Sequence, residues 1–504
     1  SLNYNFIWLL CYLLVLVGLA GYGFHRLSIV YLYWKNRNNK PQPKARFQEL
    51  PVVTVQLPMF NEKFVVDRLL ESVAALDYPQ DRLEIQILDD STDDTTEQCY
   101  RKVEELKSRG FDAVCIHRTD RTGFKAGALE AATKVAKGEF LLILDADFVP
   151  EPDLLQKTIH FFTDENVGLV QTRWGHINRE YNLLTRIQGM YLDGHFAMEQ
   201  TARNRSGRFF TFNGTAGIWR KYVIGDAGGW SHDTLTEDMD LSYRVQLKGW
   251  RFIYLNDVVT PAELPVDMDG FKSQQHRWTK GSIQVCQKIL LDIWRSNAPL
   301  KAKVEATTHL TCNYSYLLLA LLCFLVYPIC TQRIPENETV FMWFVNVALF
   351  FMTSVAVCIF YMSAQIVVRP KSWWKELPYL PLLLTLSVGM AVNNAKAVLE
   401  AIFGHQSAFV RTPKYGVDRK EDRRHVSQLK RNGYRAIKSV VIPVLEIACG
   451  TFFLNLIIIM IRQGHYLSPI LMIPFLGFYY TGFCSLGRMI SNLLPAKQTA
   501  KAKN

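Results

Sequence analysis

The sequence has no Cys-x-x-Cys pair, and its ten cysteines are scattered over 504 residues without clustering near histidines. This spacing argues against a disulfide framework and against a structural zinc site, and it suits a reducing compartment. Long apolar runs are also missing between Lys44 and Lys303, where strand-like segments alternate with helical ones. We therefore predict a soluble α/β domain for this part of the chain.

Acidic residues are scarcer than basic ones, 46 against 57, although 49% of all residues are hydrophobic. Both properties occur together in membrane proteins, because basic residues flank their concentrated apolar segments. Residues 6–24 form the first such segment, and basic residues follow it from Lys35 onward. A cleaved signal peptide would carry its basic residues before the apolar run instead. We predict a retained anchor with its amino terminus outside.

Four further apolar segments follow the soluble domain, each near the roughly 20 residues that a bilayer requires. They are residues 314–330, 341–368, 440–461 and 468–486. Residues 411–438 hold ten Lys and Arg against three acidic residues. The positive-inside rule therefore places this basic loop on the cytoplasmic side, together with the soluble domain.

Residues 377–403 do not fit as a further span. They begin apolar but then carry Asn393, Asn394, Lys396 and Glu400. A crossing at this point would also put the basic loop on the opposite face of the membrane. We predict a helix that lies in or just under the cytoplasmic interface.

The resulting plan has five membrane spans and a cytoplasmic carboxyl terminus. Its parts are an N-terminal transmembrane helix (1–30), a cytoplasmic α/β domain (44–270), interfacial helices (271–310), two transmembrane helices (311–368), the interfacial helix with the basic loop (371–439), two more transmembrane helices (440–490) and a cytoplasmic tail (491–504).

Polar clusters follow three predicted strands of the soluble domain. Residues 52–57 run toward Asn61, residues 84–88 are followed by Asp89 and Asp90, and the wholly apolar residues 140–144 are followed by Asp145 and Asp147. The order strand, helix, strand predicts a right-handed crossover and a parallel sheet. Ligands of such open sheets bind beyond the carboxyl ends of the strands.

Asp145 and Asp147 stand at i and i+2, so their side chains point the same way. Such a pair offers hard oxygen ligands to Mg²⁺, which binds through one or two carboxylates plus substrate phosphates. A turn after the strand is the alternative interpretation. Asp90 is similarly open, because an aspartate at this edge either accepts from a nucleotide base or caps the helix that follows.

Two further polar groups lie near the start of predicted helices. Lys125, between Gly123 and Gly127, is placed to neutralise phosphate oxygens, although a helix start needs no ligand. Asp238, in the stretch Thr-Leu-Thr-Glu-Asp-Met-Asp, either benefits from the helix macrodipole or takes a proton from an attacking hydroxyl. The residues alone leave both alternatives open.

The last cluster is Gln-Gln-His-Arg-Trp at residues 274–278, before a helical stretch over 283–294. If that helix includes the cluster, Gln274, Arg277 and Trp278 share one face at i, i+3 and i+4. Arg277 would then bind a diphosphate and Trp278 would stack on a sugar ring. An amphipathic helix at a membrane surface explains the same residues.

Taken in order, the motifs Asp-Asp, Asp-x-Asp, Thr-Glu-Asp and Gln-x-x-Arg-Trp resemble those of the membrane-bound processive branch of family 2 glycosyltransferases, the cellulose synthase superfamily. Residues 171–178, 212–219 and 274–278 are most similar to the cellulose synthase-like mannan and glucan synthases of plants and their bacterial relatives. The resemblance covers residues 52–416. It implies an α/β GT-A glycosyltransferase domain with a mostly parallel central sheet, inserted between transmembrane helices.

The resemblance also implies roles at the donor end of the site. Asp90 together with Asp89 would hold the nucleotide base. Asp145 and Asp147 would hold the divalent ion, Mg²⁺ or Mn²⁺, and Asp145 would also contact the diphosphate with the help of Lys125.

At the acceptor end, Asp238 is the implied base that deprotonates the acceptor hydroxyl, with inversion at the anomeric carbon. Gln274 and Arg277 would contact the diphosphate. Glu237 and Trp278 would bind the acceptor sugar at the mouth of a transmembrane channel.

Residues 409–414 resemble the gating loop Phe-x-Val-Thr-x-Lys of this family, with Arg411 where Val is usual. Thr412 and Lys414 would approach the diphosphate when the loop closes. Bacterial cellulose synthases carry Pro-His where Arg173 and Trp174 stand here, and the chain after residue 486 is too short for their cyclic-dinucleotide domain.

We expect a processive, inverting, metal-dependent hexosyltransferase that elongates a β-linked glucan or mannan from UDP-glucose or GDP-mannose and passes it through its own spans. A glycolipid glucosyltransferase acting on ceramide or diacylglycerol and a non-catalytic export scaffold are the alternatives. The expected partners are the nucleotide sugar, the growing polysaccharide and the lipid bilayer, with no nucleic acid. The expected location is the plasma, inner or Golgi membrane, with the catalytic domain cytoplasmic.

Overall fold

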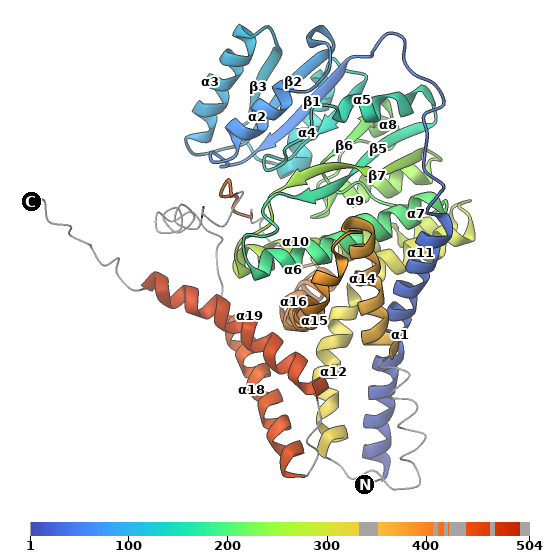
Figure 1. Cartoon of the computed structure of the whole chain (residues 1–504), viewed down its shortest axis with the longest axis vertical. Coiled ribbons are helices and arrows are strands. Elements are labelled where there is room, and N and C mark those ends of the chain that lie inside the picture. Colours follow the sequence, from blue (N-terminus) through green and yellow to red (C-terminus); the bar gives the residue numbers. More distant parts are fainter. Residues whose placement is uncertain are drawn as a thin grey trace, which may run out of the picture.

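The computed structural model describes residues 2–331, 351–406, 412–417, 422, 440–463 and 469–493. An α/β domain occupies one end of the molecule and a group of apolar helices the other (Figure 1). The long helix α10 (Met268–Arg295) lies between the two. Helix α10 therefore forms the junction between the sheet domain and the apolar helices.

A seven-stranded sheet forms the centre of the α/β domain, in the order β3-β2-β1-β4-β6-β5-β7. The strands are β1 (Val53–Met59), β2 (Leu83–Asp89), β3 (Asp112–His117), β4 (Phe140–Ile143), β5 (Val167–His176), β6 (Gly217–Arg220) and β7 (Arg251–Ala262). Four of the six strand pairings are parallel, and only β6 runs antiparallel to its neighbours β4 and β5. The prediction of a mostly parallel α/β sheet is confirmed.

Strand β4 shows why this sheet is buried on both faces. Phe140 and Leu142 belong to a core packed by α2 (Val66–Ala74) and α3 (Thr95–Ser108), whereas Leu141 and Ile143 belong to the opposite core, which α4 (Phe124–Val135) covers. Side chains alternate along a strand, so a wholly apolar strand needs cover on each side. The polar residues that follow such a strand emerge only at its carboxyl end.

The other helices of this domain surround the second half of the sheet. They are α5 (Leu154–Thr158), α6 (Leu183–Asp193), the π-helix η3 (Gly194–Gln200), α7 (Thr201–Arg205), α8 (Lys221–Asp226) and α9 (Glu237–Leu247), with short 3₁₀ turns η1 (Gln80–Arg82) and η2 (Ile159–Thr163). Helix α9 begins at Glu237, so Asp238 lies in its first turn.

Within the described residues, two helices are long and apolar enough to cross a membrane on their own. They are α1 (Leu2–Asn36), over Ile7–Asn36, and α18 (Val441–Arg462). Helices α11 (Leu300–Thr311) and α12 (Tyr314–Thr331) pass the same test together, with a bend of 53°.

Two shorter apolar segments complete this group of helices. They are Met352–Val368, which includes the π-helix η5 (Phe351–Val355) and α14 (Ala356–Val368), and Leu471–Gly487 within α19 (Pro469–Leu493). Residues 341–350 of the third predicted span and residues 494–504 of the tail lie outside the described residues. The predicted number and orientation of spans stay predictions.

We expected a single helix over residues 377–403, but the segment is broken into separate helices. It comprises the end of η6 (Trp373–Tyr379), then α15 (Leu380–Gly389) and α16 (Ala391–Ile402), with a bend of 40° after Gly389. The polar residues of α16 face α10, because Asn393 donates to the Lys272 carbonyl at 3.2 Å and Glu400 pairs with Lys280 at 3.2 Å. Their presence in an apolar stretch is explained by this packing.

Buried ion pairs join the α/β domain to the apolar helices. Lys272 of α10 donates to Glu446 of α18 at 2.5 Å. Arg203 of α7 donates to Glu305 of α11 at 2.8 Å, and Arg26 of α1 pairs with Glu199 of η3. Because removing one partner of a buried pair leaves an uncompensated charge, these contacts hold the two parts in a defined orientation.

Candidate active site

A cavity of about 200 Å³ opens beyond the carboxyl ends of β1, β2, β4, β5 and β7. Ten of the twelve predicted site residues line it: Lys125, Asp145, Asp147, Glu237, Asp238, Gln274, Arg277, Trp278, Thr412 and Lys414. They come from sequence positions nearly 300 residues apart. The cavity therefore forms only when the sheet, α9, α10 and residues 412–417 are assembled.

Lys125 connects two sides of this cavity. Its Nζ donates to Asp145 Oδ1 at 2.5 Å and to the Gly214 carbonyl at 2.9 Å. Burial alone would lower the pKa of Lys125, but the carboxylates of Asp145 and Glu237 outweigh it and raise the pKa above its ordinary value. Lys125 is therefore a charged group beside the first of the two predicted metal ligands.

Lys414 makes the equivalent contact with the second carboxylate. Its Nζ donates to Asp147 Oδ2 at 2.6 Å and to the Glu263 carbonyl at 3.1 Å. Nearby, Thr412 Oγ1 is buried without a hydrogen-bond partner among the described residues. A buried hydroxyl normally has a partner, so the hydrogen-bonding capacity of this atom is unused in this arrangement. Arg411 and the rest of the predicted gating loop, residues 409–411, lie outside the described residues.

Glu263 anchors the segment that carries Lys414. Its carboxylate accepts the backbone N–H groups of Tyr415, Gly416 and Val417 at 2.9, 3.0 and 3.2 Å. Gly416 has a φ of +68°, and a β carbon there would lie 2.8 Å from the Phe64 carbonyl, so glycine is needed. Sequence reasoning missed Glu263, although its position directly after β7 is the same signal that revealed Asp145.

The carboxylates of Asp145 and Asp147 can contribute to a divalent-ion site but cannot complete one. Each is within hydrogen-bond distance of one lysine, and the described residues contain no group of three His, Cys, Asp or Glu placed to hold a metal. Mg²⁺ and similar ions need only one or two carboxylates when substrate phosphates supply other ligands. The pair fits an ion that binds together with a phosphate-bearing ligand.

Asp238 is a half-buried carboxylate with an unusual proton affinity. Its Oδ1 accepts the Met239 N–H at 2.8 Å, while burial and the neighbouring charge of Glu237 raise the pKa of Asp238 to about 7. Gly214, with φ +82°, lets the chain pass close by, because a β carbon there would lie 3.1 Å from Asp238 Oδ2. A carboxylate with such a pKa can accept a proton near neutral pH.

Helix α10 already includes the Gln-x-x-Arg-Trp cluster, since it begins at Met268 and not near residue 283. Gln274, Arg277 and Trp278 all line the cavity, which favours a ligand-facing role over a membrane surface. Gly281 allows this arrangement, because a β carbon there would lie 2.5 Å from Thr236 Cγ2 at the start of α9. The helix thus packs directly against the turn that carries Asp238.

The two remaining predicted residues do not line the cavity. Asp89 accepts from His117 Nδ1 at 2.7 Å and from the Ser91 N–H at 3.0 Å. Asp90 forms a two-pronged pair with the Arg118 guanidinium, at 2.8 and 2.6 Å. Both carboxylates are thus engaged by neighbouring strand and loop residues. Their contact with a nucleotide base stays a prediction.

Aromatic side chains form the wall near Trp278. The Trp174 ring stacks on Phe196 with centroids 4.6 Å apart, and it lies 5.2 Å from Phe148 and 6.4 Å from Trp278. Aromatic faces of this kind suit the apolar face of a sugar ring. The cavity therefore has a cationic and acidic part near Lys125 and an aromatic part near Trp278.

Residues 51–281 match the family described as Glycosyltransferase like family 2. This is the family whose motifs the sequence resembles, and the match covers the part of the chain that forms the α/β domain.

Two relatives of this chain are named as glucomannan mannosyltransferases. The chain is 42% identical over 286 residues to Glucomannan 4-beta-mannosyltransferase 2 of Arabidopsis thaliana, and 41% identical over 277 residues to Glucomannan 4-beta-mannosyltransferase 1 of Oryza sativa subsp. japonica. Both matches cover 54% of this chain and 53% of the relative, so the chain spans about half the length of the curated relatives it matches. The expected similarity to cellulose synthase-like mannan synthases is confirmed.

A solved structure shares the fold. It is a mannosyltransferase from Pyrobaculum calidifontis in complex with GDP-Man and Mn²⁺, with a TM-score of 0.55 and 19% sequence identity. The match covers 78% of this chain and 100% of that one. The α/β domain therefore has the expected GT-A fold, with apolar helices before and after it.

Proposed function

We propose that the protein is an inverting, metal-dependent hexosyltransferase that elongates a β-linked mannan or glucan from a nucleotide sugar. The observation that carries the proposal is the cavity itself, which gathers a carboxylate of raised pKa, two lysines, an arginine and an aromatic wall. GDP-mannose is the first donor to test, because the relatives at 41–42% identity are named as mannosyltransferases. UDP-glucose is the second.

In this mechanism Asp238 takes the proton of an acceptor hydroxyl as the oxygen attacks the anomeric carbon of the donor sugar. The bond from that carbon to the diphosphate breaks in the same displacement, and the sugar inverts. Lys125, Arg277 and Lys414 stabilise the negative charge that develops on the leaving nucleoside diphosphate. Asp145 and Asp147 would hold Mg²⁺ or Mn²⁺, which supplies further neutralisation of the diphosphate when it is bound.

The acceptor chain is proposed to extend from the aromatic wall near Trp278 toward the apolar helices. Support comes from the position of α10, which carries Trp278 and packs against both α16 and α19. A polymer that grows at this end would leave the cavity on the membrane side. Processive synthesis, export through the protein's own spans and a cytoplasmic catalytic domain in a plasma, inner or Golgi membrane all belong to this proposal.

The product decides between the proposal and its alternatives. Detergent-solubilised protein is incubated with labelled GDP-mannose or UDP-glucose and Mg²⁺ or Mn²⁺, and the product is extracted with chloroform and then digested with linkage-specific β-glycosidases. We expect label in a polymer that stays out of chloroform and is released by a β-mannanase. Label that extracts entirely into chloroform would indicate a glycolipid product, and no transfer from any donor would indicate a non-catalytic scaffold.

Substituting Glu237 by Gln is expected to shift the pH dependence of the reaction. Asp238 is active as a base only above its pKa of about 7, so kcat/KM should rise with pH through that value. Glu237 is one cause of the raised pKa, and removing its charge should move this rise to lower pH. The pH profile of kcat/KM for both proteins checks this, and an unchanged profile or a shift to higher pH contradicts it.

A further inference from the structure

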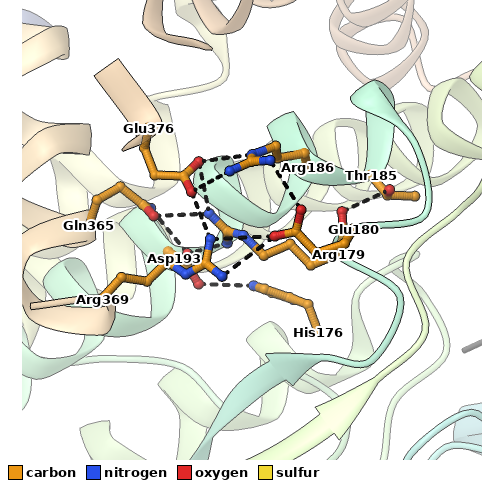
Figure 2. Close-up of polar contacts among 9 residues, drawn as sticks. All are labelled: His176, Arg179, Glu180, Thr185, Arg186, Asp193, Gln365, Arg369 and Glu376. Carbon is orange, nitrogen blue, oxygen red and sulfur yellow. Dashed lines mark hydrogen bonds and ion pairs between the residues drawn. The ribbon is translucent and has the colours of Figure 1, made fainter. Parts of the chain in front are cut away.

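His176, to which the sequence pattern assigned no role, lines the aromatic part of the cavity. His176 is the last residue of β5, and its side chain is 6% exposed. Its Nε2 lies 2.9 Å from Oδ1 of Asp193, the last residue of α6, whose side chain is 2% exposed (Figure 2). A buried carboxylate and a cavity-lining imidazole thus form a pair outside the mechanism described above.

The second ring nitrogen of His176 is not engaged by any of the described residues. Nδ1 has no hydrogen-bond partner among the described residues, and it is not one of the fully buried polar atoms that lack one. By contrast, the indole Nε1 of Trp174, two residues earlier on the same strand, is fully buried. It has no hydrogen-bond partner among the described residues. Of the two side chains, His176 is therefore the one that presents a polar atom to a ligand.

Asp193 determines which ring nitrogen is presented. Burial alone would raise the pKa of Asp193, but the His176 ring and the Arg179 guanidinium outweigh it and hold this pKa well below its ordinary value. An ionised carboxylate can only accept, so Nε2 must carry the shared hydrogen. Nδ1 is left as the ligand-facing atom, and the ring cannot rotate without losing its bond to Asp193.

Asp193 itself is held from the side of the apolar helices. Its Oδ2 accepts from Arg179 Nη1 at 2.7 Å and from Gln365 Nε2 of α14 at 3.1 Å. Arg179 Nη2 donates in turn to Gln365 Oε1 at 2.9 Å. Figure 2 shows Asp193 between His176 and Gln365. Arg179 contacts both Asp193 and Gln365.

A second carboxylate extends this cluster to η6. Glu376, which is fully buried, accepts from Arg369 Nη1 at 2.7 Å and from Arg186 Nη2 at 3.0 Å, and it pairs with Arg179 at 3.5 Å. Asp193, the residue that contacts the His176 ring, therefore belongs to a buried cluster with members on α6, α14 and η6. One wall of the cavity is built on the helices that lead toward the membrane.

The surroundings of His176 suit a sugar better than a phosphate. Trp174 and His176 stand at i and i+2 on β5, and the Trp174 ring neighbours Trp278 at 6.4 Å. Leu192 and Leu264 line the cavity beside them. A single polar atom among aromatic and aliphatic side chains matches a sugar ring, whose faces are apolar and whose hydroxyls both donate and accept.

We propose that His176 is an acceptor-binding residue whose Nδ1 hydrogen-bonds a hydroxyl of the acceptor sugar seated against Trp278, with Asp193 as its positioning residue. This inference rests on the proposed function and adds to it a specificity determinant for the acceptor. The donor sugar and its diphosphate are bound elsewhere in the cavity, by Lys125 and Arg277. Changes at His176 should therefore separate acceptor binding from donor binding.

The test varies a soluble β-linked mannose oligosaccharide as acceptor at saturating GDP-mannose, and then varies the donor at saturating acceptor. His176→Gln keeps an amide that can reach Asp193 but removes Nδ1. We expect the acceptor KM to rise about tenfold, as for the loss of one hydrogen bond, while the donor KM stays within about twofold of its original value. Asp193→Asn should raise the acceptor KM in the same way, because its amide no longer dictates which ring nitrogen carries the hydrogen.

Gln365→Leu is the matched control. It removes one bond to Asp193 and one to Arg179, but it leaves the pair of Asp193 and His176 intact. Its acceptor KM should stay within about twofold even if its melting temperature falls. Binding of the nucleoside diphosphate, measured by calorimetry, shows for each variant that the cavity has folded.

Two results separate the inference from the function on which it rests. If the unmodified protein transfers sugar and His176→Gln leaves the acceptor KM unchanged, or if Gln365→Leu raises it as much as His176→Gln does, the role of His176 is overturned while the proposed function stands. If the unmodified protein transfers no sugar from any donor, both are overturned.

Discussion

Replacing Asp238 by Asn is expected to lower kcat by about 10²- to 10⁴-fold, the range typical for loss of a general base. Asparagine has the same shape and can still accept the Met239 N–H, so the first turn of α9 should be preserved. It cannot take up the proton of an acceptor hydroxyl. The measurement is the rate of sugar transfer at saturating donor and acceptor, together with binding of the nucleoside diphosphate, which should be unchanged.

Asp233→Asn is a suitable control for this variant. Asp233 lies five residues earlier and pairs with Lys288 on α10 at 2.8 Å, but it does not line the cavity. Its kcat should remain within about twofold of the original value, as for other surface substitutions. Full turnover of Asp238→Asn would show that another group accepts the proton.

Replacing Asp147 by Asn is expected to lower kcat/KM by about 10²- to 10³-fold, because the loss of a metal ligand removes several kcal/mol of charge stabilisation. The affinity for Mn²⁺ in the presence of the nucleoside diphosphate should fall as well. The second measurement matters, because the substitution would also release the Lys414 ammonium, which donates to the Asp147 carboxylate at 2.6 Å. Only a metal role predicts weaker Mn²⁺ binding.

Asp153→Asn provides the comparison for Asp147. Asp153 is half-exposed, and its side chain pairs with Lys157 at i,i+4, at 2.6 Å. We expect it to leave both the Mn²⁺ titration and the rate unchanged, since exposed pairs contribute little. If Asp147→Asn titrates with Mn²⁺ as the unmodified protein does, the assignment of Asp147 as a metal ligand is wrong.

Lys125 and Lys414 balance the charge of the cavity before a ligand binds. Each lysine neutralises one of the two cavity-lining carboxylates, Asp145 and Asp147, which would otherwise carry uncompensated charge. A divalent cation and a diphosphate also carry opposite charges, so they can pair with the aspartates and the lysines in turn. If the loop of residues 409–414 closes as expected, Lys414 would move from Asp147 to the diphosphate without leaving a buried charge unpaired.

Local pattern predicted much of the fold and of the site. The apolar residues of β1, β2 and β4 predicted buried parallel strands, because a strand covered on both faces must be apolar throughout. Since ligands bind beyond the carboxyl ends of such strands, the motif after β4 could be assigned to the cavity without coordinates. The i, i+3, i+4 spacing likewise predicted that Gln274, Arg277 and Trp278 share one face of a helix.

Other features could not be predicted from local pattern. Asp89 and Asp90 follow β2 as expected, but the adjacent strand β3 brings His117 and Arg118 against them, and this pairing depends on the register between the strands. The break of the segment 377–403 at Met390 was missed for a similar reason. Its polar residues are stabilised by α10, more than a hundred residues earlier in the chain.

The sequence by itself determined the strands that end in carboxylates, the helical spacing of the Gln-x-x-Arg-Trp cluster and the apolar segments, because each is set by neighbours within a few residues. Only the tertiary structure decided that Glu263 anchors the segment with Lys414 and that Asp193 orients His176 at the cavity wall. These contacts join residues on different elements, and their free energy depends on the relative placement of those elements. No local period in the chain encodes that placement.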